Sequence, residues 1–374
     1  MRPLRGLLVV PVALALLGPT TADSRPGPGA GATATADTVA TADSFLPLLR
    51  TRGEVPAAAL LADEKSGTRY AESGPDISRS DHFRAGSVTK TFLATVILQL
   101  ASERRLSLSD PVERHLPGLV RGAGNDGRAL TLRSLLNHTS GLYDFARDTG
   151  GTRPVTPVQA VRIALTHPPA DRGRYAYSNT DYVLLGLVVT RVTGRSYATE
   201  AERRILDPLG LDGTSFPGSR TFLPSPHGRA YGTDGSDVTD LDPRVAGAAG
   251  ELVTTLADLN RFYSALLSGE LLPPRWRREM LDTRAAHGSY GLGLIPARLP
   301  CGVTVWGHNG RIPGSYVRTA ATVDGRHVLT FRVNTTAMAD PDLEPALLAA
   351  EFCPRTYWNE QAPNGDPGQQ HSFE

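Results

Sequence analysis

Two residues of the chain combine a nucleophile with a base at helical spacing. Ser87 and Lys90 stand three positions apart in Ser-Val-Thr-Lys, directly after Gly86. Apolar residues recur with a helical period over residues 89–103, so the serine and the lysine should share one helical face. A serine hydroxyl becomes a strong nucleophile when a neighbouring base takes its proton, and a desolvated lysine is such a base. The positive end of the helix dipole also favours an anion at Ser87.

Lysine is scarce in this chain, which favours a chemical role for Lys90. Only Lys65 and Lys90 among the 39 basic residues are lysines. Arginine keeps its proton in proteins, whereas a buried lysine can lose it. Lys65 fits an ordinary surface position. A Ser-x-x-Lys spacing taken alone also arises by chance, and Ser87 would serve equally as a helix N-cap.

A second group of polar residues, Tyr177-Ser178-Asn179, precedes the strongly apolar segment 181–192. A tyrosine beside a lysine can pass protons, and an asparagine amide can orient both a lysine and a substrate carbonyl. The alternative is a simple turn with Asn179 as the N-cap of the next helix.

A third group, His308-Asn309-Gly310, follows a strand expected over residues 303–307. A glycine at a strand edge lets a substrate backbone approach closely, and an imidazole can donate or accept a proton in a cleft. One histidine among nine means little by itself. The order of the three groups, each at the end of a regular element, is more informative than any one of them.

That order resembles the family of class C β-lactamases and D-alanyl-D-alanine carboxypeptidases, whose motifs are Ser-x-x-Lys, Tyr-x-Asn and Lys-Thr-Gly or His-x-Gly. The likeness extends to three further segments and covers residues 45–350. Thr-Leu-Arg-Ser-Leu-Leu-Asn-His-Thr-Ser-Gly-Leu at 131–142 is similar to the family's LLxHTSGL stretch. Leu-Asp-Pro-Leu-Gly-Leu at 206–211, with Thr214, is similar to its PLGMxxT turn, and residues 249–262 to its glycine-led strand and helix. The Tyr-Ser-Asn and His-x-Gly forms of the motifs, the expected secretion signal and the late cysteine pair look most like those of the secreted soluble carboxypeptidases.

The resemblance implies a role for each motif residue. Ser87 would form the acyl-enzyme, while Lys90 and Tyr177 would take the hydroxyl proton and pass it to the leaving amine. Asn179 would orient the substrate amide and Lys90, and His308 and Gly310 would line the strand along which the substrate lies. The backbone N–H groups of Ser87 and Arg311 would form the oxyanion hole.

One departure from the family pattern concerns carboxylate binding. Many of these carboxypeptidases carry Thr on both sides of the third-motif glycine, where this chain has Asn309 and Arg311. Arg311 or Arg298 could bind a carboxylate bidentately instead. We therefore expect a D-alanyl-D-alanine carboxypeptidase or transpeptidase, with a β-lactamase, an esterase or a D-amino-acid peptidase or amidase as alternatives. A non-catalytic binding protein of the same fold is the third hypothesis.

The remaining pattern predicts an α+β fold with strands at both ends of the chain and helices in the middle. Helices are expected at 38–51, 89–103, 132–136, 155–165, 181–192 and 258–267. Strands are expected at 55–63, 68–72, 291–295, 303–307, 317–323 and 328–333. The first and last strands should join in one antiparallel sheet flanked by helices, with the mostly helical middle region building the cleft wall.

The chain ends differ in composition from the expected catalytic domain at 38–358. Residues 1–22 carry two arginines, an apolar stretch and small residues, as in a signal peptide for secretion, with a retained anchor as the alternative. Residues 23–37 form a Gly/Pro-rich linker, and 359–374 a polar tail expected to be disordered.

Cysteine content and charge narrow the remaining possibilities. Cys301 and Cys353 would pair as a disulfide in an oxidising compartment, two free thiols being the alternative. A net charge of +1 and the lack of basic clusters argue against nucleic acid or an anionic membrane as partners. No cofactor and no metal are expected, and the partner should be a small peptide or a β-lactam-like substrate of a monomeric enzyme.

Overall fold

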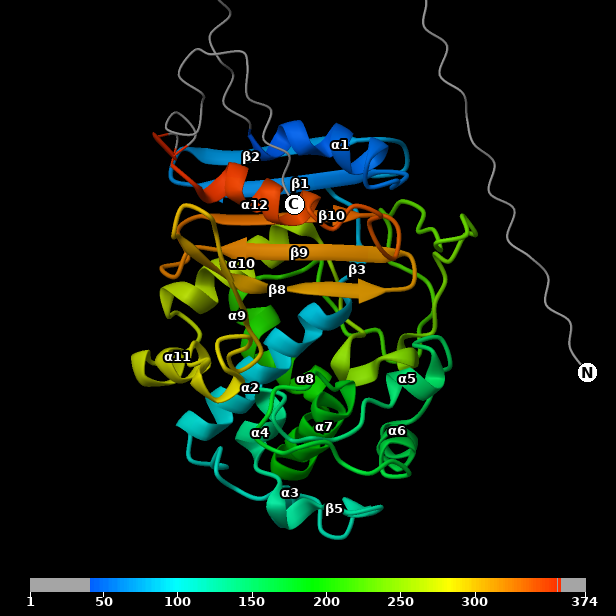
Figure 1. The fold of residues 1–374 in the computed structure, drawn as a ribbon, viewed down its shortest axis with the longest axis vertical. Coiled ribbons are helices and arrows are strands. Elements are labelled where there is room, and N and C mark those ends of the chain that lie inside the picture. The colour runs from blue at the N-terminus through cyan, green and yellow to red at the C-terminus, as the bar shows by residue number, and fades with distance from the viewer. Residues whose placement is uncertain (1–40, 355, 358–374) are drawn as a thin grey trace, which may run out of the picture. The chain divides into compact units, whose positions relative to one another are not determined.

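Residues 41–354 and 356–357 are described by a computed structural model, and the expected leader, linker and tail lie outside them. The central feature is a six-stranded antiparallel sheet of order β2-β1-β10-β9-β8-β7 (Figure 1). The strands are β1 (Ala58–Glu64), β2 (Gly67–Ser73), β7 (Ile295–Arg298), β8 (Thr304–Ile312), β9 (Ser315–Ala321) and β10 (Val328–Val333). The pairing of β1 with β10 confirms that the first and last strands share one sheet.

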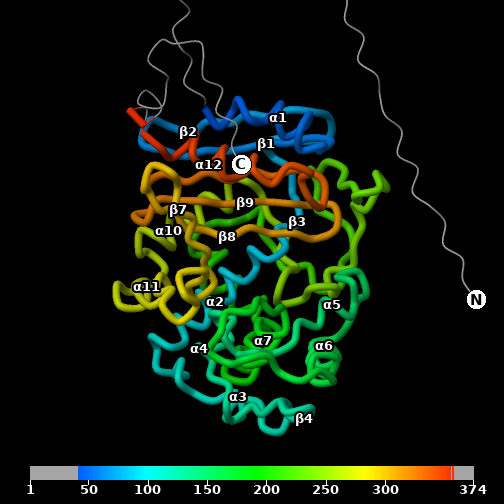
Figure 2. The backbone as a smooth tube through the Cα atoms, viewed as in Figure 1, coloured from blue at the N-terminus to red at the C-terminus, as the bar shows by residue number. Residues whose placement is uncertain are grey.

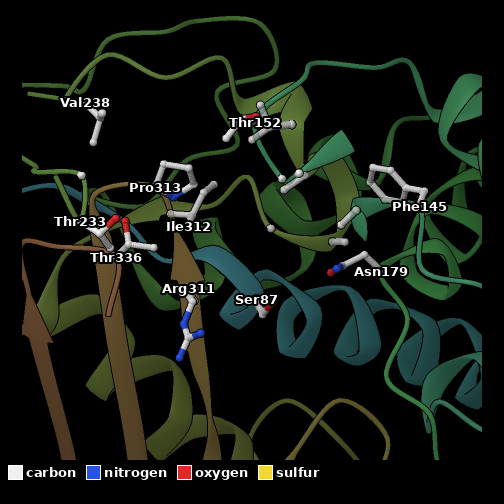
Figure 3. Close-up of a pocket in the computed structure, with 18 of the residues that line it drawn as sticks. Ser87, Phe145, Thr152, Asn179, Thr233, Val238, Arg311, Ile312, Pro313 and Thr336 are labelled. Carbon is white, nitrogen blue, oxygen red and sulfur yellow. The ribbon is translucent and has the colours of Figure 1, made fainter. Parts of the chain in front are cut away.

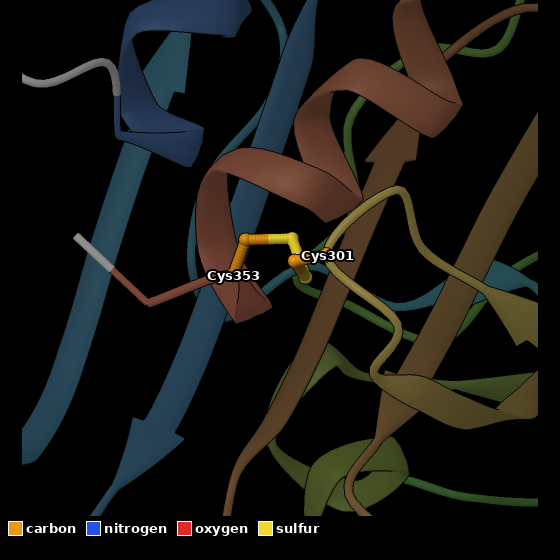
Figure 4. Close-up of a disulfide and its surroundings, with 2 residues drawn as sticks. All are labelled: Cys301 and Cys353. Carbon is orange, nitrogen blue, oxygen red and sulfur yellow. A yellow bond between two sulfur atoms is a disulfide. The ribbon is translucent and has the colours of Figure 1, made fainter. Parts of the chain in front are cut away.

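Helices from the two ends of the chain cover one face of the sheet. They are α1 (Phe45–Thr51) and α12 (Leu343–Phe352), which lie beside β1 and β2 (Figure 2). Their buried leucines pack with alternate residues of the sheet strands, among them Leu60, Phe331 and Val333. A disulfide between Cys301 and Cys353, with Cα atoms 5.8 Å apart, joins the end of α12 to the loop before β8 (Figure 4).

The opposite face of the sheet packs on α2 (Thr89–Ser102) and α10 (Leu256–Ser268). Twelve of the 14 residues of α2 are buried, because the helix lies between the sheet and the helical middle region. A helix that is apolar all round belongs in the interior of a protein. The first turn of α2, which carries Lys90, is therefore buried, and Ser87 lies directly before it in the turn Gly86–Val88.

The middle of the chain is helical, as expected. The principal helices are α3 (Val112–His115), α4 (Leu132–Leu136), α5 (Ala146–Thr149), α6 (Pro157–Ala164), α7 (Asn179–Thr193), α8 (Tyr197–Ala201), α9 (Asp207–Leu209) and α11 (Pro274–Met280). Local signals fix several of their ends. Thr131 and Thr156 each form a capping box, and Gly194 ends α7 in the left-handed conformation.

Shorter elements complete the fold. They are β3 (Phe83–Arg84) paired with β6 (Val253–Thr254), β4 (Arg121–Gly122) paired with β5 (Asn125–Asp126), and the 3-10 turns η2 (Gly86–Val88), η5 (Pro243–Val245) and η6 (Gly247–Ala249). In the part of the chain that the structure describes, no helix is long and apolar enough to cross a membrane.

Two strand predictions need correction. Residues 291–294 are not a strand, because the Gly291 N–H bonds the Leu294 carbonyl in a tight turn and β7 begins at Ile295. Strand β8 runs on to Ile312 instead of ending at 307, so residues 308–311 lie within a strand. Its polar residues keep their strand partners on β9, with His308 opposite Thr319 and Arg311 opposite Tyr316. The short helices α3, α5, α8 and α9 and the helices α11 and α12 were not expected.

Candidate active site

The turn that carries Ser87 is clamped between strand β8 and the segment after η6. Gly86 has φ 51°, which favours glycine, and a Cβ there would lie 2.8 Å from the Arg311 nitrogen. A Cβ on Gly310 would lie 1.8 Å from the Ala85 carbonyl oxygen, so only glycine fits. The close approach sets the backbone of Arg311 beside the Ser87 turn.

Lys90 is fully buried and has three polar neighbours. Its Nζ lies 2.9 Å from Ser87 Oγ, 2.8 Å from Asn179 Oδ1 and 2.7 Å from the Ala249 carbonyl oxygen. An amide oxygen and a carbonyl oxygen can only accept hydrogen bonds. They therefore take both N–H groups of a neutral amine, which leaves its lone pair directed at the hydroxyl of Ser87.

Burial favours that neutral amine. Desolvation lowers the pKa of Lys90 to about 7, against the opposing effect of the negative charges of Asp144 and Asp181. A base with this pKa is poised to accept a proton near neutral pH. The geometry and the pKa thus agree that Lys90 can deprotonate Ser87.

Tyr177 approaches the same hydroxyl from another side. Its hydroxyl group donates to Ser87 Oγ at 2.9 Å, and its ring lies 4.9 Å from Lys90 Nζ. Desolvation raises the pKa of the phenol, so it stays protonated at neutral pH. Ser87 can then donate to Lys90 while it accepts from Tyr177, which suits Tyr177 to pass protons and not to act as the first base.

Asn179 opens helix α7 and is held by a carboxylate that the sequence had not singled out. Its Nδ2 donates to both oxygens of Asp144, at 3.2 and 3.1 Å, and its backbone N–H donates to Asp144 Oδ1 at 3.2 Å. These bonds fix the amide with its oxygen toward Lys90. Asp144 stands next to the 131–142 segment quoted above, but no local period marks it as a site residue.

A buried pair lies beneath Tyr177 and was likewise missed. His138 Nδ1 lies 2.9 Å from Asp181 Oδ2, and Ser140 donates to Asp181 Oδ1 at 2.5 Å. The imidazole packs on the ring of Tyr177 with centroids 4.3 Å apart, and the Ala176 N–H donates to the His138 carbonyl. The pair supports the Tyr177 loop from below. The sequence signal that could have identified this pair is the run Leu-Leu-Asn-His-Thr-Ser at 135–140.

The third motif is brought to the site, but its side chains point different ways. His308 is 1% exposed and pairs through Nε2 with the Tyr290 hydroxyl at 2.8 Å. Burial lowers the pKa of His308 to about 3, so the ring is neutral and does not act as an acid. The side chain of Asn309 contacts the Tyr316 hydroxyl at 3.5 Å. Direct contact of the His308 ring with substrate would require it to leave Tyr290.

A cavity of about 560 Å³ opens over the nucleophile (Figure 3). Asn179 and Phe145 lie on one side of Ser87, and Arg311, Thr233 and Thr336 lie on the other. Arg311 is exposed and forms no ion pair with the residues that the structure describes. Ser87, Asn179 and Arg311 are among the residues that line the cavity, whereas His308 and Asn309 are not.

No group of three His, Cys, Asp or Glu side chains among residues 41–354 is placed to hold a metal ion. The cavity holds the parts that acyl transfer needs, which are a nucleophile, a base and a proton donor on one oxygen.

Comparison with known proteins places this site among serine hydrolases. Residues 48–352 match the Beta-lactamase family model. Penicillin-binding protein 4 of Amycolatopsis lactamdurans is 32% identical over 240 residues, which are 60% of this chain and 63% of that protein. PbpX of Bacillus subtilis is 27% identical over 278 residues, 73% of this chain and 65% of that protein. The chain thus spans less than two thirds of the length of these relatives.

Two solved structures match over almost their whole length. A D-stereospecific amidohydrolase from Streptomyces sp. is 40% identical with a TM-score of 0.78, covering 83% of this chain and 98% of that one. The D-amino acid amidase from Ochrobactrum anthropi SV3 is 27% identical with a TM-score of 0.73, covering 86% and 98%. The likeness therefore extends over more than four fifths of this chain.

Proposed function

Since the chain belongs to the beta-lactamase family and is a serine acyl-enzyme hydrolase, we propose that it cleaves amide bonds on the carboxyl side of D-amino-acid residues. The observation that carries the proposal is the set of contacts on Ser87 Oγ, with Lys90 Nζ and Tyr177 OH each at 2.9 Å. The choice of a D-amino-acid amide is supported by the 40% identical amidohydrolase, which this chain covers over 98% of its length.

The reaction follows from these contacts. Ser87 Oγ adds to the amide carbonyl while its proton moves to the lone pair of Lys90. The backbone N–H groups of Ser87 and Arg311 stabilise the oxyanion. The C–N bond then breaks, and the proton passes from Lys90 by way of Tyr177 to the leaving amine. Water then adds to the ester carbonyl while Lys90 takes its proton. The bond between the acyl carbon and Ser87 Oγ breaks as Lys90 returns that proton to Oγ, which releases the free acid and restores Ser87.

Carboxypeptidase action on D-Ala-D-Ala peptides is the second candidate. Arg311 lines the cavity, and its guanidinium, which points away from the other lining residues and lies 6.0 Å from the centre of the Tyr316 ring, forms no ion pair with described residues and could turn toward the cavity. A guanidinium in that place can bind the terminal carboxylate of such a peptide in two parallel hydrogen bonds. If this candidate is right, a peptide that ends in D-Ala-D-Ala with a free carboxylate should be a better substrate than the same peptide with its C-terminus amidated.

Three substrates and one inhibitor test the proposal. We expect the protein to hydrolyse D-alanine p-nitroanilide at least 100-fold faster in kcat/KM than the L-enantiomer, with no activity in Ser87→Ala. Intact mass spectrometry after incubation with benzylpenicillin should show one adduct on Ser87. Preference for diacetyl-L-Lys-D-Ala-D-Ala would favour the carboxypeptidase. Equal rates on both enantiomers would exclude D-stereospecific action.

We also propose that the protein is exported, on the basis of the leader-like residues 1–22 and the Cys301–Cys353 disulfide. N-terminal sequencing of protein recovered from the culture medium tests this. A mature chain that begins near Asp23 is expected. Recovery of the whole chain with Met1 from the cells alone would contradict export.

A further inference from the structure

A second cavity of about 330 Å³ lies behind Phe145. Its walls are mostly apolar, and they include Phe145, Val155, Ala160, Val183, Tyr197 and Ala248. The volume falls at the lower end of the range for small-molecule sites, and an apolar wall with few polar groups is typical of such sites. The cavity lies outside the cluster of residues around Ser87.

The two cavities share a wall. Phe145 and Ala246 line both of them, and the chain segment that follows Ala246 separates them. Ala249 and Gly250 face the catalytic cavity, where the Ala249 carbonyl also accepts from Lys90. Ala248 and Glu251 face the second cavity. The second cavity therefore adjoins the Asn179 and Phe145 side of the catalytic cavity.

Glu251 gives the second cavity its charge. The residue is 4% exposed, its carboxylate accepts from the Tyr197 hydroxyl, and Oε2 accepts from the Gly218 N–H at 3.2 Å. Both partners are neutral, and no ion pair to Glu251 forms within the described residues. A carboxylate has about four acceptor positions, so two stay unused. A buried charge without a counter-charge is unfavourable, and burial accordingly raises the pKa of Glu251.

The other charged residue at the cavity is already neutralised. Arg244 lines the rim, and its Nε donates to both oxygens of Asp242, at 3.0 and 3.1 Å. Its Nη2 makes a further contact with Asp242 at 2.5 Å. The unbalanced charge of the cavity is thus the carboxylate of Glu251 at the end of an apolar wall.

We propose that this cavity is a specificity subsite for the acyl part of the substrate, and that it takes an aliphatic side chain ending in an ammonium group. The inference rests on the proposed function, and it requires the Phe145 side chain, which lines both cavities, to turn aside so that a substrate bonded to Ser87 can reach the second cavity. The methylene groups lie along the apolar wall, and the ammonium pairs with Glu251. D-Lysine and D-ornithine residues have this chemistry, whereas D-norleucine has the chain without the charge.

Kinetics of two matched substrates test the subsite. We expect the protein to prefer D-lysine p-nitroanilide over D-norleucine p-nitroanilide by at least tenfold in kcat/KM. Glu251→Gln should lower this ratio at least tenfold and leave the rate on D-norleucine p-nitroanilide within about threefold. Glu270→Gln, at an exposed position after α10, is the matched control and should keep the ratio. An unchanged ratio in Glu251→Gln would overturn the proposal.

A binding measurement separates the subsite from the catalytic proposal. Calorimetric titration of Ser87→Ala with D-lysinamide and D-norleucinamide needs no turnover. We expect at least tenfold tighter binding of D-lysinamide, lost in the Ser87→Ala, Glu251→Gln double variant. Ala198→Phe, which fills the cavity from α8, should weaken both ligands without affecting D-alaninamide. Equal binding of the two long-chain amides would refute the subsite, whereas absent turnover with selective binding would refute only the proposed function.

Discussion

The Nζ atom of Lys90 lies 2.7 Å from the carbonyl oxygen of Ala249, the shortest of its three polar contacts. This contact joins the start of α2 to η6, which together with Phe145 separates the catalytic cavity from the second cavity. A carbonyl that can only accept, opposite a second acceptor on Asn179, sets the direction of the lysine lone pair. The direction of the amine's lone pair is therefore set in part by backbone that comes from a distant part of the chain.

The first prediction concerns the dependence of activity on pH. Burial lowers the pKa of Lys90 to about 7, and only the neutral amine can accept the Ser87 proton. Below this pH the amine is protonated, so kcat/KM should fall by about tenfold for each pH unit. Above it the rate should reach a plateau. A profile on D-alanine p-nitroanilide from pH 5 to 9 checks this, and an acid limb centred near pH 4 would point to a carboxylate base instead.

The second prediction compares the same substitution, lysine to arginine, at the two lysines of the chain. Lys90→Arg replaces the base by a guanidinium that keeps its proton, so kcat should fall by roughly 10³-fold or more. Lys65→Arg makes the same change in the turn between β1 and β2 and should leave kcat unchanged. Thermal unfolding by circular dichroism shows whether each variant is folded. Substantial activity in a folded Lys90→Arg protein would remove lysine from the mechanism.

The third prediction isolates the hydroxyl of Tyr177. Tyr177→Phe keeps the ring that packs on His138 and removes only the donor to Ser87 Oγ. We expect a loss in kcat of roughly 10²- to 10³-fold, within the usual range for a positioned proton-transfer group. Tyr70→Phe removes a hydroxyl on β2 that contacts Glu72 and does not line the cavity, and it serves as the control. Equal activity of Tyr177→Phe and the parent protein would contradict the proton relay.

Much of the fold follows from the sequence, and the exceptions have physical causes. The apolar run before Gly194 predicts α7 within two residues, because a helical period and a glycine cap agree. The segment 291–294 is equally apolar and buried, yet it forms a turn. A short apolar run shows burial without showing conformation. Strand β8 continues past the apolar residues at its start because its pairing with β9 extends to Ile312.

The candidate site divides in the same way. Lys90 and Tyr177 both contact the Ser87 hydroxyl, and Asn179 contacts Lys90, so these four residues come together as their order and spacing led us to expect. Asp144 carries no such signal, because its contact with Asn179 joins residues 35 positions apart through a loop. The sequence also did not predict that the His308 ring is buried. That orientation depends on a hydrogen bond with the Tyr290 hydroxyl, and no local pattern marks Tyr290.

The fourth prediction follows from Asp144. Its negative charge raises the pKa of Lys90, so Asp144→Asn should move the acid limb of the kcat/KM profile to lower pH. The variant also weakens the anchoring of the Asn179 amide, and we expect kcat at pH 8 to fall by roughly tenfold. Asp148→Asn, four positions further on in α5 and paired with His167 at the surface, is the control. A shift of the limb to higher pH would show that the sign of the Asp144 effect is wrong.

The fifth prediction separates stability from catalysis through the disulfide. Cys301 and Cys353 are 52 positions apart, so their bond removes loop freedom from the unfolded chain and stabilises the fold by about 4 kcal/mol. The bond joins α12 to the loop before β8 on the sheet face away from α2, where it touches no residue of the cavity. The Cys301→Ser, Cys353→Ser double variant should therefore unfold at a lower urea concentration while its kcat at 25 °C stays within about twofold. Treating the parent protein with a reductant should lower its unfolding midpoint to that of the double variant. A large loss of kcat in variant protein that is still folded would mean that the outer helix layer positions the Ser87 turn, which lies against β8 through Gly310.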